Sequence, residues 1–484
     1  MTIERRKPLR ARVGVLGVGH HTYWSQFEGL REVMLGKIET FKLKLGGCAV
    51  DVWDFGLVDD SKAAYAALDE MKMADLDLLF IDMVTYATSA TFAPLVQALS
   101  IPIVLVVLQP LKAMDYARGT TFMQLCNDDF CSVPEFCSVA VRMGKKAPPL
   151  VIGLREGDEE ADEEIRSWCR IAHVLHDLKR ARIGLMGHVL ECMYDMHVDP
   201  SLITRSFGCH VVQLEPEDIY KHYSRLGEAE LAPMRARILS FFDTPDPVSD
   251  NLTSTLLESD LAVAAKAAVA LDRAIDELGL TGLAYYYEGE EGSDLRRMVT
   301  NFIVGNSLLT AAGFPMCGEF DLKTCVGMLI MDRLEIGGSF AEFHPMDFNT
   351  GSILVGHDGP HHLNIADRKP VLRSLSKYHG KPGSGAGVEF KIKEGPLTML
   401  SVTVNSAGML KFVIAEGESL RGPIPPTGNT NTHGYFKPDV KTFLKRWTAE
   451  GPTHHFALGI GHHGDELEKL AQTLGIDYAR IPNE

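Results

Sequence analysis

The sequence predicts an α/β protein made of two doubly wound parallel-sheet domains followed by a β-rich, antiparallel C-terminal domain. In the first third of the chain, apolar runs of strand length alternate with amphipathic stretches of helix length, which is typical of a parallel sheet covered by helices. A second series with the same alternation begins after residue 178. Beyond about residue 325 the apolar segments are short, closely spaced and joined by Gly-, Asn- and Lys-containing turns, which is typical of antiparallel strands.

The N-terminal α/β domain is expected to span residues 1–178. Its predicted strands are the β-rich apolar runs Val13–Leu16, Ala49–Phe55, Leu76–Asp82 and Pro102–Val107. Its predicted helices are the amphipathic stretches Trp24–Leu43, Ser61–Met73, Thr88–Leu99 and Asp158–Asp177. The last helix has an acidic first turn, and we expect it to pack on the sheet and close the domain.

Residues 179–324 are expected to form the central α/β domain, and residues 325–484 the β-rich domain. The central elements are, in order, strand Arg182–Met186, helix Pro200–Phe207, strand His210–Leu214, helix Asp260–Leu278 and strand Gly282–Tyr287. The C-terminal elements are strands Val388–Ile392, Thr398–Val404 and Leu410–Ala415, then helix Asp465–Leu474 and strand Tyr478–Ile481.

The composition indicates which kinds of partner the protein binds and in which cellular compartment it lies. Lys and Arg total 48 against 64 Asp and Glu, for a net charge of -16, so the chain lacks the basic excess that binds a phosphate backbone. No run reaches the roughly 18 consecutive apolar residues of a membrane-spanning helix, and the run Val13–Leu16 is too short for a signal-peptide core. The nine cysteines form no CxxC pairs, which favours buried reduced thiols. We therefore expect a soluble, cytoplasmic protein with no nucleic-acid or membrane partner.

The loop after the first strand is a candidate ligand crevice. It carries Gly17-Val18-Gly19-His20-His21, which is glycine-rich but not a complete GxGxxG dinucleotide motif. Open α/β sheets bind ligands at the carboxyl ends of their strands. We therefore expect His20, His21, Tyr23 and Trp24 to contact the substrate.

A second group of polar residues lies at the ends or edges of predicted elements. Glu319 precedes the predicted helix Leu322–Leu334, Glu342 lies in a strand-like segment, and His357 follows the strand Ile353–Val355. Together with a histidine from the segment 452–463, they offer two carboxylates and two imidazoles, a set that suits Mn²⁺, Mg²⁺ or Co²⁺. Spacing alone does not separate such a site from a chance combination of Glu and His, because the chain holds 18 His and 64 acidic residues.

Four short segments resemble the L-arabinose isomerases, in the same order along the chain. Gly318–Thr324 is similar to their Gly-Glu-Gly-Asp-Trp-Lys-Thr, and Gly338–Glu342 to their Gly-Thr-Ser-Phe-Met-Glu. Ile353–His357 is similar to their Leu-Val-Leu-Gly-Ser-His, and Thr453–His455 to their Ala-His-His. The resemblance extends over most of the chain but is specific only in these segments.

The resemblance to this family of L-arabinose and L-fucose isomerase-like enzymes implies a site and a reaction. The metal ligands would be Glu319, Glu342, His357 and His455, and the first histidine of the pair, His454, is expected to contact substrate. The implied reaction is an aldose-ketose isomerisation through a cis-enediol, with Glu319 and Glu342 as both ligands and proton shuttles and Mn²⁺, Mg²⁺ or Co²⁺ as cofactor. A homo-oligomer, in the family a hexamer, is also implied.

The chain departs from the family near the predicted substrate. Where the family has Gly-Ser-Gln-His-Leu-Tyr-Gly after the first strand, this chain has Gly17 to Trp24 without the glutamine. A pentose, a hexose or a deoxy sugar therefore all remain open as substrate. Two alternative functions also remain, an epimerase with the same metal centre and a non-catalytic intracellular sugar-binding protein.

Two further groups of polar residues have simpler interpretations. In Asn127-Asp128-Asp129-Phe130 we favour a helix cap over a position facing the crevice. Four other histidines are expected to lie in loops or on the surface, where one of them could support a ligand: His361, His362, His462 and His463.

Overall fold

The computed structural model describes residues 3–190, 193–245, 253–359, 361–375, 377–378, 381–382, 385–425 and 429–482. The chain forms two compact units. We call Leu9–His176 the N-terminal unit, and Met1–Pro8 together with Asp177–Glu484 the C-terminal unit. Each unit is described by itself.

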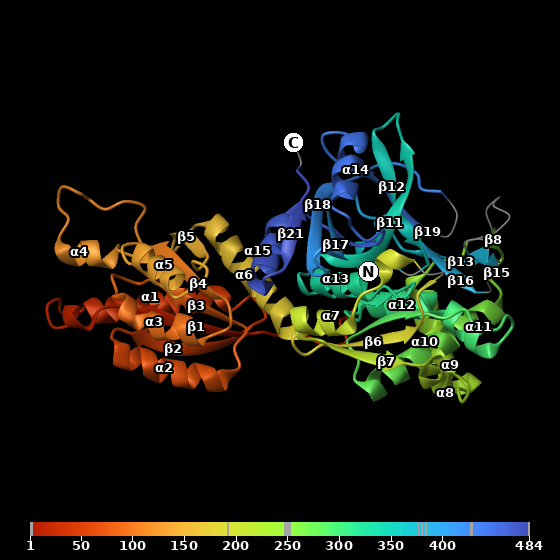
Figure 1. The fold of residues 1–484 in the computed structure, drawn as a ribbon, viewed down its shortest axis with the longest axis horizontal. Helices are drawn as coiled ribbons and strands as arrows, with labels where there is room; N and C mark the ends of the chain where they lie inside the picture. The colour runs from red at the N-terminus through yellow and green to blue at the C-terminus, as the bar shows by residue number, and fades with distance from the viewer. Residues whose placement is uncertain are drawn as a thin grey trace. The chain divides into compact units, whose positions relative to one another are not determined.

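The N-terminal unit is built on a five-stranded parallel sheet in the order β2-β1-β3-β4-β5. The strands are β1 Arg12–Val18, β2 Asp51–Val58, β3 Leu78–Asp82, β4 Ile103–Gln109 and β5 Leu150–Leu154. The helices are α1 Leu30–Leu45, α2 Ser61–Ala74, α3 Ala93–Ala98, α4 Thr121–Cys126, α5 Val133–Arg142 and α6 Glu159–Leu178. Helices flank this sheet, as Figure 1 shows in red and orange.

The apolar side chains of β3 point alternately to the two faces of the sheet, and helices cover both faces. Every residue of β3 is buried, as expected for a central parallel strand. Leu79 and Ile81 belong to the apolar cluster that α2, α3 and α5 share with the sheet. Phe80, between them, points to the other face, where its ring packs against Phe41 of α1 with 5.4 Å between the ring centroids.

Helix α1 begins later than the sequence predicts. The expected helix Trp24–Leu43 is instead a 3₁₀ turn, His21–Tyr23, followed by an α-helix that starts at Leu30. Gly29 has a φ of 84°, a left-handed conformation that ends any helix arriving from the N-terminal side. The predicted helix Thr88–Leu99 is likewise divided, into the 3₁₀ turn Ser89–Thr91 and α3.

The C-terminal unit contains a second parallel sheet, in the order β10-β9-β6-β7. Its strands are β6 Arg182–Gly187, β7 His210–Leu214, β9 Gly282–Tyr286 and β10 Met316–Cys317. The helices of this region are α7 Pro200–Phe207, α8 Pro216–Tyr223, α9 Glu228–Phe241, α10 Glu258–Leu278, α11 Asp294–Thr300, α12 Phe302–Ala311 and α13 Leu322–Arg333.

The remainder of the C-terminal unit is a closed antiparallel barrel. Six strands pair in the order β17-β20-β11-β12-β19-β18, pairing between β17 and β18 closes the ring, and β21 adds to β18 in parallel. These strands are β11 Gly337–Asp347, β12 Ser352–Asp358, β17 Gly395–Val404, β18 Leu410–Leu420, β19 Asn429–Tyr435, β20 Phe456–Ile460 and β21 Asp477–Arg480. Helices α14 Val440–Ala449 and α15 Gly464–Leu474 accompany them, and the short strands are β8 Thr253–Ser254, β13 Val371–Leu375, β14 Lys377–Tyr378, β15 Lys381–Pro382 and β16 Ala386–Glu389. The two parallel sheets and the antiparallel barrel confirm the predicted fold class.

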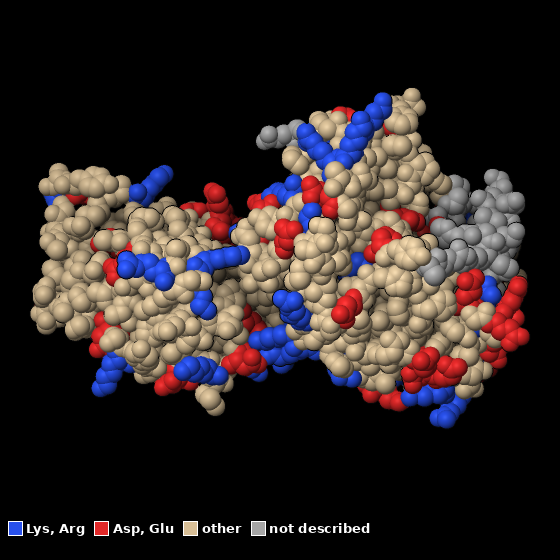
Figure 2. Space-filling view, in the orientation of Figure 1, with Lys and Arg blue, Asp and Glu red and all other residues tan. Residues whose placement is uncertain are grey.

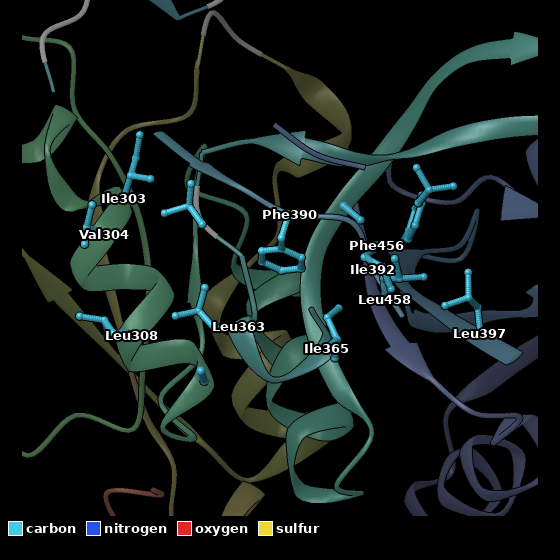
Figure 3. Close-up of a cluster of buried hydrophobic side chains, with 14 of the residues drawn as sticks. Ile303, Val304, Leu308, Leu363, Ile365, Phe390, Ile392, Leu397, Phe456 and Leu458 are labelled. Carbon is cyan, nitrogen blue, oxygen red and sulfur yellow. The ribbon is translucent and has the colours of Figure 1, made fainter. Parts of the chain in front are cut away.

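One apolar core joins the barrel to the helices of the C-terminal unit. Figure 3 shows Leu308 of α12 in the same cluster as Phe390 and, from β20, Leu458. Burial of this kind contributes about 25 cal/mol per Å² of apolar surface removed from water, so the barrel and α12 stabilise each other. The core thereby fixes β11 and β12, which carry Glu342 and His357, and β20, which directly follows His455.

Acidic and basic side chains are interspersed on the face of the molecule drawn in Figure 2. Among the residues that the structure describes, none of the helices combines the length and the apolar composition that a membrane crossing requires.

Candidate metal centre

Glu319 occupies a tight turn between β10 and α13. Glu319 and the following Phe320 both have left-handed backbones, with φ of 56° and 67°, which costs a non-glycine residue about 1–2 kcal/mol each. The turn is held because Phe320 N donates to the carbonyl of Tyr285 at 3.1 Å. It ends at Asp321, which caps α13 by accepting a hydrogen bond from Thr324 N at 3.1 Å. The cap therefore fixes the position of Glu319 at the start of the helix.

Glu342 and His357 lie on neighbouring barrel strands. Glu342 of β11 pairs with Gly356 of β12, the residue directly before His357. His357 Nε2 lies 3.7 Å from Glu319 Oε1 and 3.9 Å from Glu342 Oε1. On its other side, His357 Nδ1 lies 2.8 Å from the carbonyl oxygen of Asp358, which makes Nδ1 the protonated nitrogen and leaves the lone pair of Nε2 toward the carboxylates.

His455 reaches the same place from the residues just before β20. Its side chain is completely buried, and its Nδ1 lies 3.2 Å from Asp321 Oδ2. Its Nε2 lies 3.5 Å from Glu319 Oε2 and has no hydrogen-bond partner among the described residues. The ring of Phe340 packs against both imidazoles, with centroids 4.2 Å from His357 and 4.3 Å from His455. A buried imidazole nitrogen without a partner is costly, and a cation would satisfy it.

The four side chains that the sequence nominated as metal ligands thus converge in the C-terminal unit. One ligand atom each of Glu342, His357 and His455 lies within 4.8 Å of the others, and the same holds for Glu319, His454 and His455. An ion with ligand bonds of about 2.1 Å places its ligand atoms about 3–4 Å apart, a spacing similar to the contacts of Glu319 and His357 given above. The donor set fits a divalent cation.

Asp321 contacts His455 of the candidate site, and the sequence interpretation did not give it a role. Burial by itself would raise the pKa of Asp321, but Lys323 and His455 outweigh burial and lower it. Lys323 is fully buried, 3.7 Å from Asp321 Oδ1, and donates to the carbonyl of Met196 at 2.9 Å. A carboxylate on the far nitrogen of a ligand histidine fixes its tautomer and its orientation. The signal available in the sequence was an aspartate directly before a helix, two residues after Glu319.

Comparisons with known proteins find similarity to sugar isomerases. The family of the L-fucose isomerase C-terminal domain matches residues 357–481, which include His357, His454 and His455. The L-arabinose isomerase of Aeromonas hydrophila is 22% identical over 357 residues, which are 72% of this chain and 69% of that protein. That of Aeromonas salmonicida is 23% identical with the same coverage, and that of Yersinia pestis strain Pestoides F is 22% identical over 78% of this chain and 74% of its own.

The chain is thus similar to L-arabinose isomerases over most of its length and to the L-fucose isomerase C-terminal domain over residues 357–481. A solved structure of a gut microbial diltiazem-metabolizing enzyme aligns with 38% of this chain and 52% of its own, at 12% identity and a TM-score of 0.19, an overlap too small to bear on the fold.

His454, predicted to contact substrate, lies at the open side of the same cluster. Its Nε2 is 4.0 Å from Glu319 Oε2, and its side chain is 37% exposed. Its Nδ1 lies 2.6 Å from Asp195 Oδ2. The hydrogen bond from His454 lowers the pKa of Asp195 to about 2. Burial alone would lower the pKa of His454, but Asp195, Glu319 and Glu342 raise it.

The four substrate residues predicted from the first loop lie in the N-terminal unit. His20 packs its ring against Tyr23 at 5.1 Å and against Tyr86 at 5.9 Å. Trp24 Nε1 donates to Asp59 Oδ2 at 2.6 Å, and His21 Nδ1 lies 3.4 Å from the Asp59 carbonyl oxygen. These residues follow β1, β2 and β3, so they gather at the carboxyl edge of the sheet as expected, and their contact with substrate remains a prediction.

Two of the four other histidines lie in a loop, as expected, but not on the surface. His361 and His362 lie in a loop but are buried, with 1% and 4% of their surface exposed. Burial lowers the pKa of His361 to about 3. His362 Nε2 lies 3.7 Å from Asp332, and the backbone N–H groups of both histidines donate to serine hydroxyls. Of the other pair, His462 is exposed and His463 half-buried.

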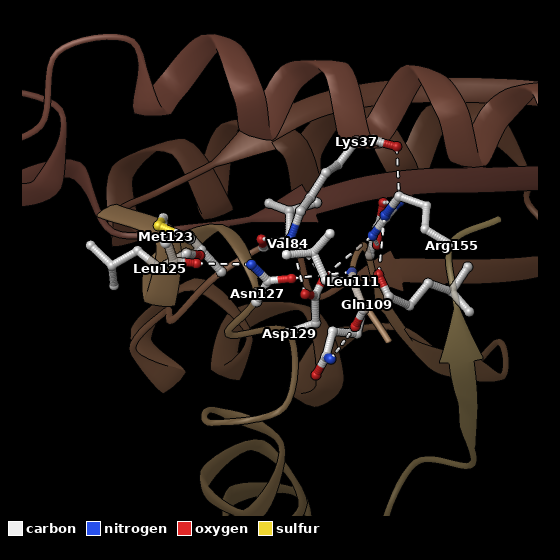
Figure 4. A network of polar contacts seen from close by, with 12 residues as sticks. Lys37, Val84, Gln109, Leu111, Met123, Leu125, Asn127, Asp129 and Arg155 are labelled. Carbon is white, nitrogen blue, oxygen red and sulfur yellow. Dashed lines mark hydrogen bonds and ion pairs between the residues drawn. The ribbon is translucent and has the colours of Figure 1, made fainter. Parts of the chain in front are cut away.

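The expectation that 127–130 caps a helix was wrong for Asp129. Asp129 is buried and accepts hydrogen bonds from Lys37 Nζ at 2.9 and 3.0 Å (Figure 4). Lys37 also donates to the carbonyl of Val84 at 2.7 Å. Arg155 lies 3.4 Å from Asp129 and pairs with Asp82 through two hydrogen bonds. The four charges form a buried network within the N-terminal unit.

Proposed function

We propose that the chain is a metal-dependent aldose-ketose isomerase that acts through a cis-enediol on a pentose, a hexose or a deoxy sugar. The observation that carries the proposal is the convergence of Glu319, Glu342, His357 and His455. In this cluster the Nε2 of buried His455 faces Glu319 and has no hydrogen-bond partner among the described residues. The relationship to the sugar isomerases supports the reaction class.

The residues of the cluster divide the chemistry between them. His357 and His455 would hold Mn²⁺, Mg²⁺ or Co²⁺ together with the two glutamates, and such an ion polarises the carbonyl and hydroxyl oxygens of a sugar. One glutamate takes the proton from the carbon next to the carbonyl, which gives the cis-enediol. The same proton returns to the neighbouring carbon, while the second glutamate moves a proton between the two oxygens. No net atom is gained or lost.

A panel of aldoses incubated with the protein and Mn²⁺, followed by ketose detection and sugar chromatography, tests the proposal. Ketose formation from at least one sugar is expected. If the sole product is an epimer of the aldose, the metal centre performs epimerisation instead. If no sugar changes but sugars bind, the chain is a sugar-binding protein and the isomerase proposal is wrong.

Metal binding has its own test, which needs no substrate. A ligand that binds only the folded state stabilises it by about 2.7 kcal/mol at a hundred times its Kd. We therefore expect Mn²⁺ to raise the melting temperature of chelator-treated protein, and His455→Ala to reduce that rise. Identical melting curves with and without Mn²⁺ would contradict the metal assignment.

We also propose that the protein is a cytoplasmic homo-oligomer, with the hexamer of the resembled family as the expected form. The support is the family resemblance, in which neighbouring subunits help to close each site. Light scattering at micromolar concentration tests the assembly, and a monomer would contradict it.

A further inference from the structure

Two adjacent imidazoles in the candidate metal centre have the same arrangement. His454 has its Nδ1 2.6 Å from a carboxylate oxygen of Asp195, and His455 has its Nδ1 3.2 Å from one of Asp321. Their Nε2 atoms lie 4.0 and 3.5 Å from the same oxygen, Glu319 Oε2. Each carboxylate therefore leaves the Nε2 of its histidine available toward Glu319.

Exposure distinguishes the two histidines. The side chain of His455 has no exposed surface, so its Nε2 faces only the buried cluster. The side chain of His454 is 37% exposed and that of Asp195 is 41% exposed. A molecule arriving from solvent can therefore reach His454 but not His455.

Asp195 is itself held in place relative to the metal cluster. It lies in the 3₁₀ turn Tyr194–Met196, and the carbonyl of Met196 accepts a hydrogen bond from buried Lys323 in the first turn of α13. Its Oδ2 accepts hydrogen bonds from both Nδ1 and the backbone N of His454, the latter at 3.0 Å. Both the ring and the main chain of His454 are thus tied to one carboxylate oxygen.

We propose that Asp195 is a positioning residue, which holds His454 so that its Nε2 hydrogen-bonds an oxygen of the sugar beside Glu319. The inference rests on the proposed isomerase function and deepens it, because it assigns His454 to the sugar and not to the metal. A sugar oxygen bound to His454 Nε2 would be a close neighbour of the Glu319 carboxylate, where the proton transfers take place. Asp195 then acts on the reaction only through the orientation of His454.

The kinetic test compares Asp195→Ala and Asp195→Asn with a matched control, Asp199→Asn. Asp199 lies four residues further along the same segment, where it caps α7, and asparagine caps a helix equally well. Loss of the carboxylate partner should lower kcat/KM by about 10- to 100-fold in Asp195→Ala. Asp195→Asn should lie between Asp195→Ala and the wild type, because an amide oxygen still accepts from Nδ1–H. Asp199→Asn should match the wild type.

A metal titration separates positioning of substrate from support of the metal. The Mn²⁺ affinity of Asp195→Ala should stay within about threefold of the wild type, because Asp195 contacts none of the four proposed ligands directly. If Mn²⁺ affinity falls in step with kcat/KM and excess Mn²⁺ restores turnover, His454 serves the metal and the proposal is overturned. A wild-type kcat/KM in Asp195→Ala overturns it as well.

An NMR measurement of His454 tests the role of Asp195 without depending on enzyme activity. In histidine-selective ¹⁵N NMR of Mg²⁺-loaded protein, the His454 signals are those that disappear in His454→Gln. We expect a protonated, hydrogen-bonded Nδ1 in the wild type and in Asp199→Asn, and its loss in Asp195→Ala. An unchanged His454 signal in Asp195→Ala would show that Asp195 does not hold the ring. If the wild type converts no aldose, the proposed isomerase function fails, while this arm still decides whether Asp195 orients His454.

Discussion

Replacing Lys37 by methionine should destabilise the N-terminal unit far more than the same change at a surface lysine. Lys37 has 4% of its side chain exposed and bonds both oxygens of Asp129 as well as a backbone carbonyl. Removing one partner of a buried ion pair costs about 3–5 kcal/mol, because the remaining charge stays buried without compensation. Arg155 lies 3.4 Å from Asp129, a longer contact that would compensate little of the lost interaction with Lys37. In a unit of this size, we expect a melting temperature lower by about 6–20 °C.

The matched control lies on the same helix. Lys42 of α1 pairs with Glu39 and Asp54, whose side chains are 69% and 40% exposed, so Lys42→Met should cost about 0–1 kcal/mol. Tryptophan fluorescence during thermal and urea unfolding reports mainly on this unit, which contains three of the four tryptophans. Adding Asp129→Leu to Lys37→Met should recover part of the loss, because both charges are then gone. Equal stability of Lys37→Met and Lys42→Met would refute the reasoning.

Three further predictions concern the metal ligands, a reactive thiol and a buried carboxylate. When turnover is measured across an Mn²⁺ titration, excess Mn²⁺ should partly restore the activity of His455→Ala. The activity of Glu342→Gln should stay roughly 10²- to 10⁴-fold below that of the wild type at every Mn²⁺ concentration. Full restoration of Glu342→Gln would show that Glu342 is a metal ligand only. The thiol of Cys48 should be alkylated increasingly as the pH rises through 7, because a hydrogen bond from Cys169 lowers the pKa of this thiol to about 7. Mass spectrometry after brief iodoacetamide treatment measures the alkylated fraction at each pH. A midpoint of alkylation near pH 9 would contradict the prediction. Asp332→Ala should cost about 3–5 kcal/mol in urea unfolding at pH 7, because two arginines lose a carboxylate that is 5% exposed. Burial opposes ionisation of Asp332, but its hydrogen-bond and arginine partners outweigh burial and lower its pKa. The loss of stability in Asp332→Ala should therefore shrink below about pH 4, where the carboxylate of the unfolded wild type becomes protonated. A loss that stays constant with pH would show that the carboxylate is unpaired.

The fold class could be predicted from sequence because buried parallel strands are continuous apolar runs. Strand β3 is buried at all of its residues, and the helices around it keep one apolar face. Closure of the barrel could not be predicted, because pairing of β17 with β18, and of β19 with β12, joins segments whose register is not a local property. The late start of α1 depends on the backbone at Gly29, which composition does not specify.

The candidate site was accessible from sequence only in part. The motif segments around Glu319, Glu342, His357 and His455 nominated residues that the structure brings together, although their roles in binding and catalysis remain predictions. Asp195 was missed because it meets His454 across 259 residues of sequence, and nothing in its own segment marks it. Burial of a charged residue is similarly invisible when its partner is distant in sequence.

The assignment of residues 1–8 to the C-terminal unit imposes an order on folding during synthesis. Arg5 pairs with Asp332, 327 residues further on, and at about 5–20 residues per second a ribosome needs roughly 15–65 s to supply that partner. The N-terminal unit is completed earlier, since its two ends meet at Asp77, which bonds Arg12 N and His176 Nδ1 at 2.7 Å each. The first segment to leave the ribosome is therefore among the last to find its place, and a chaperone has a long interval in which to bind it.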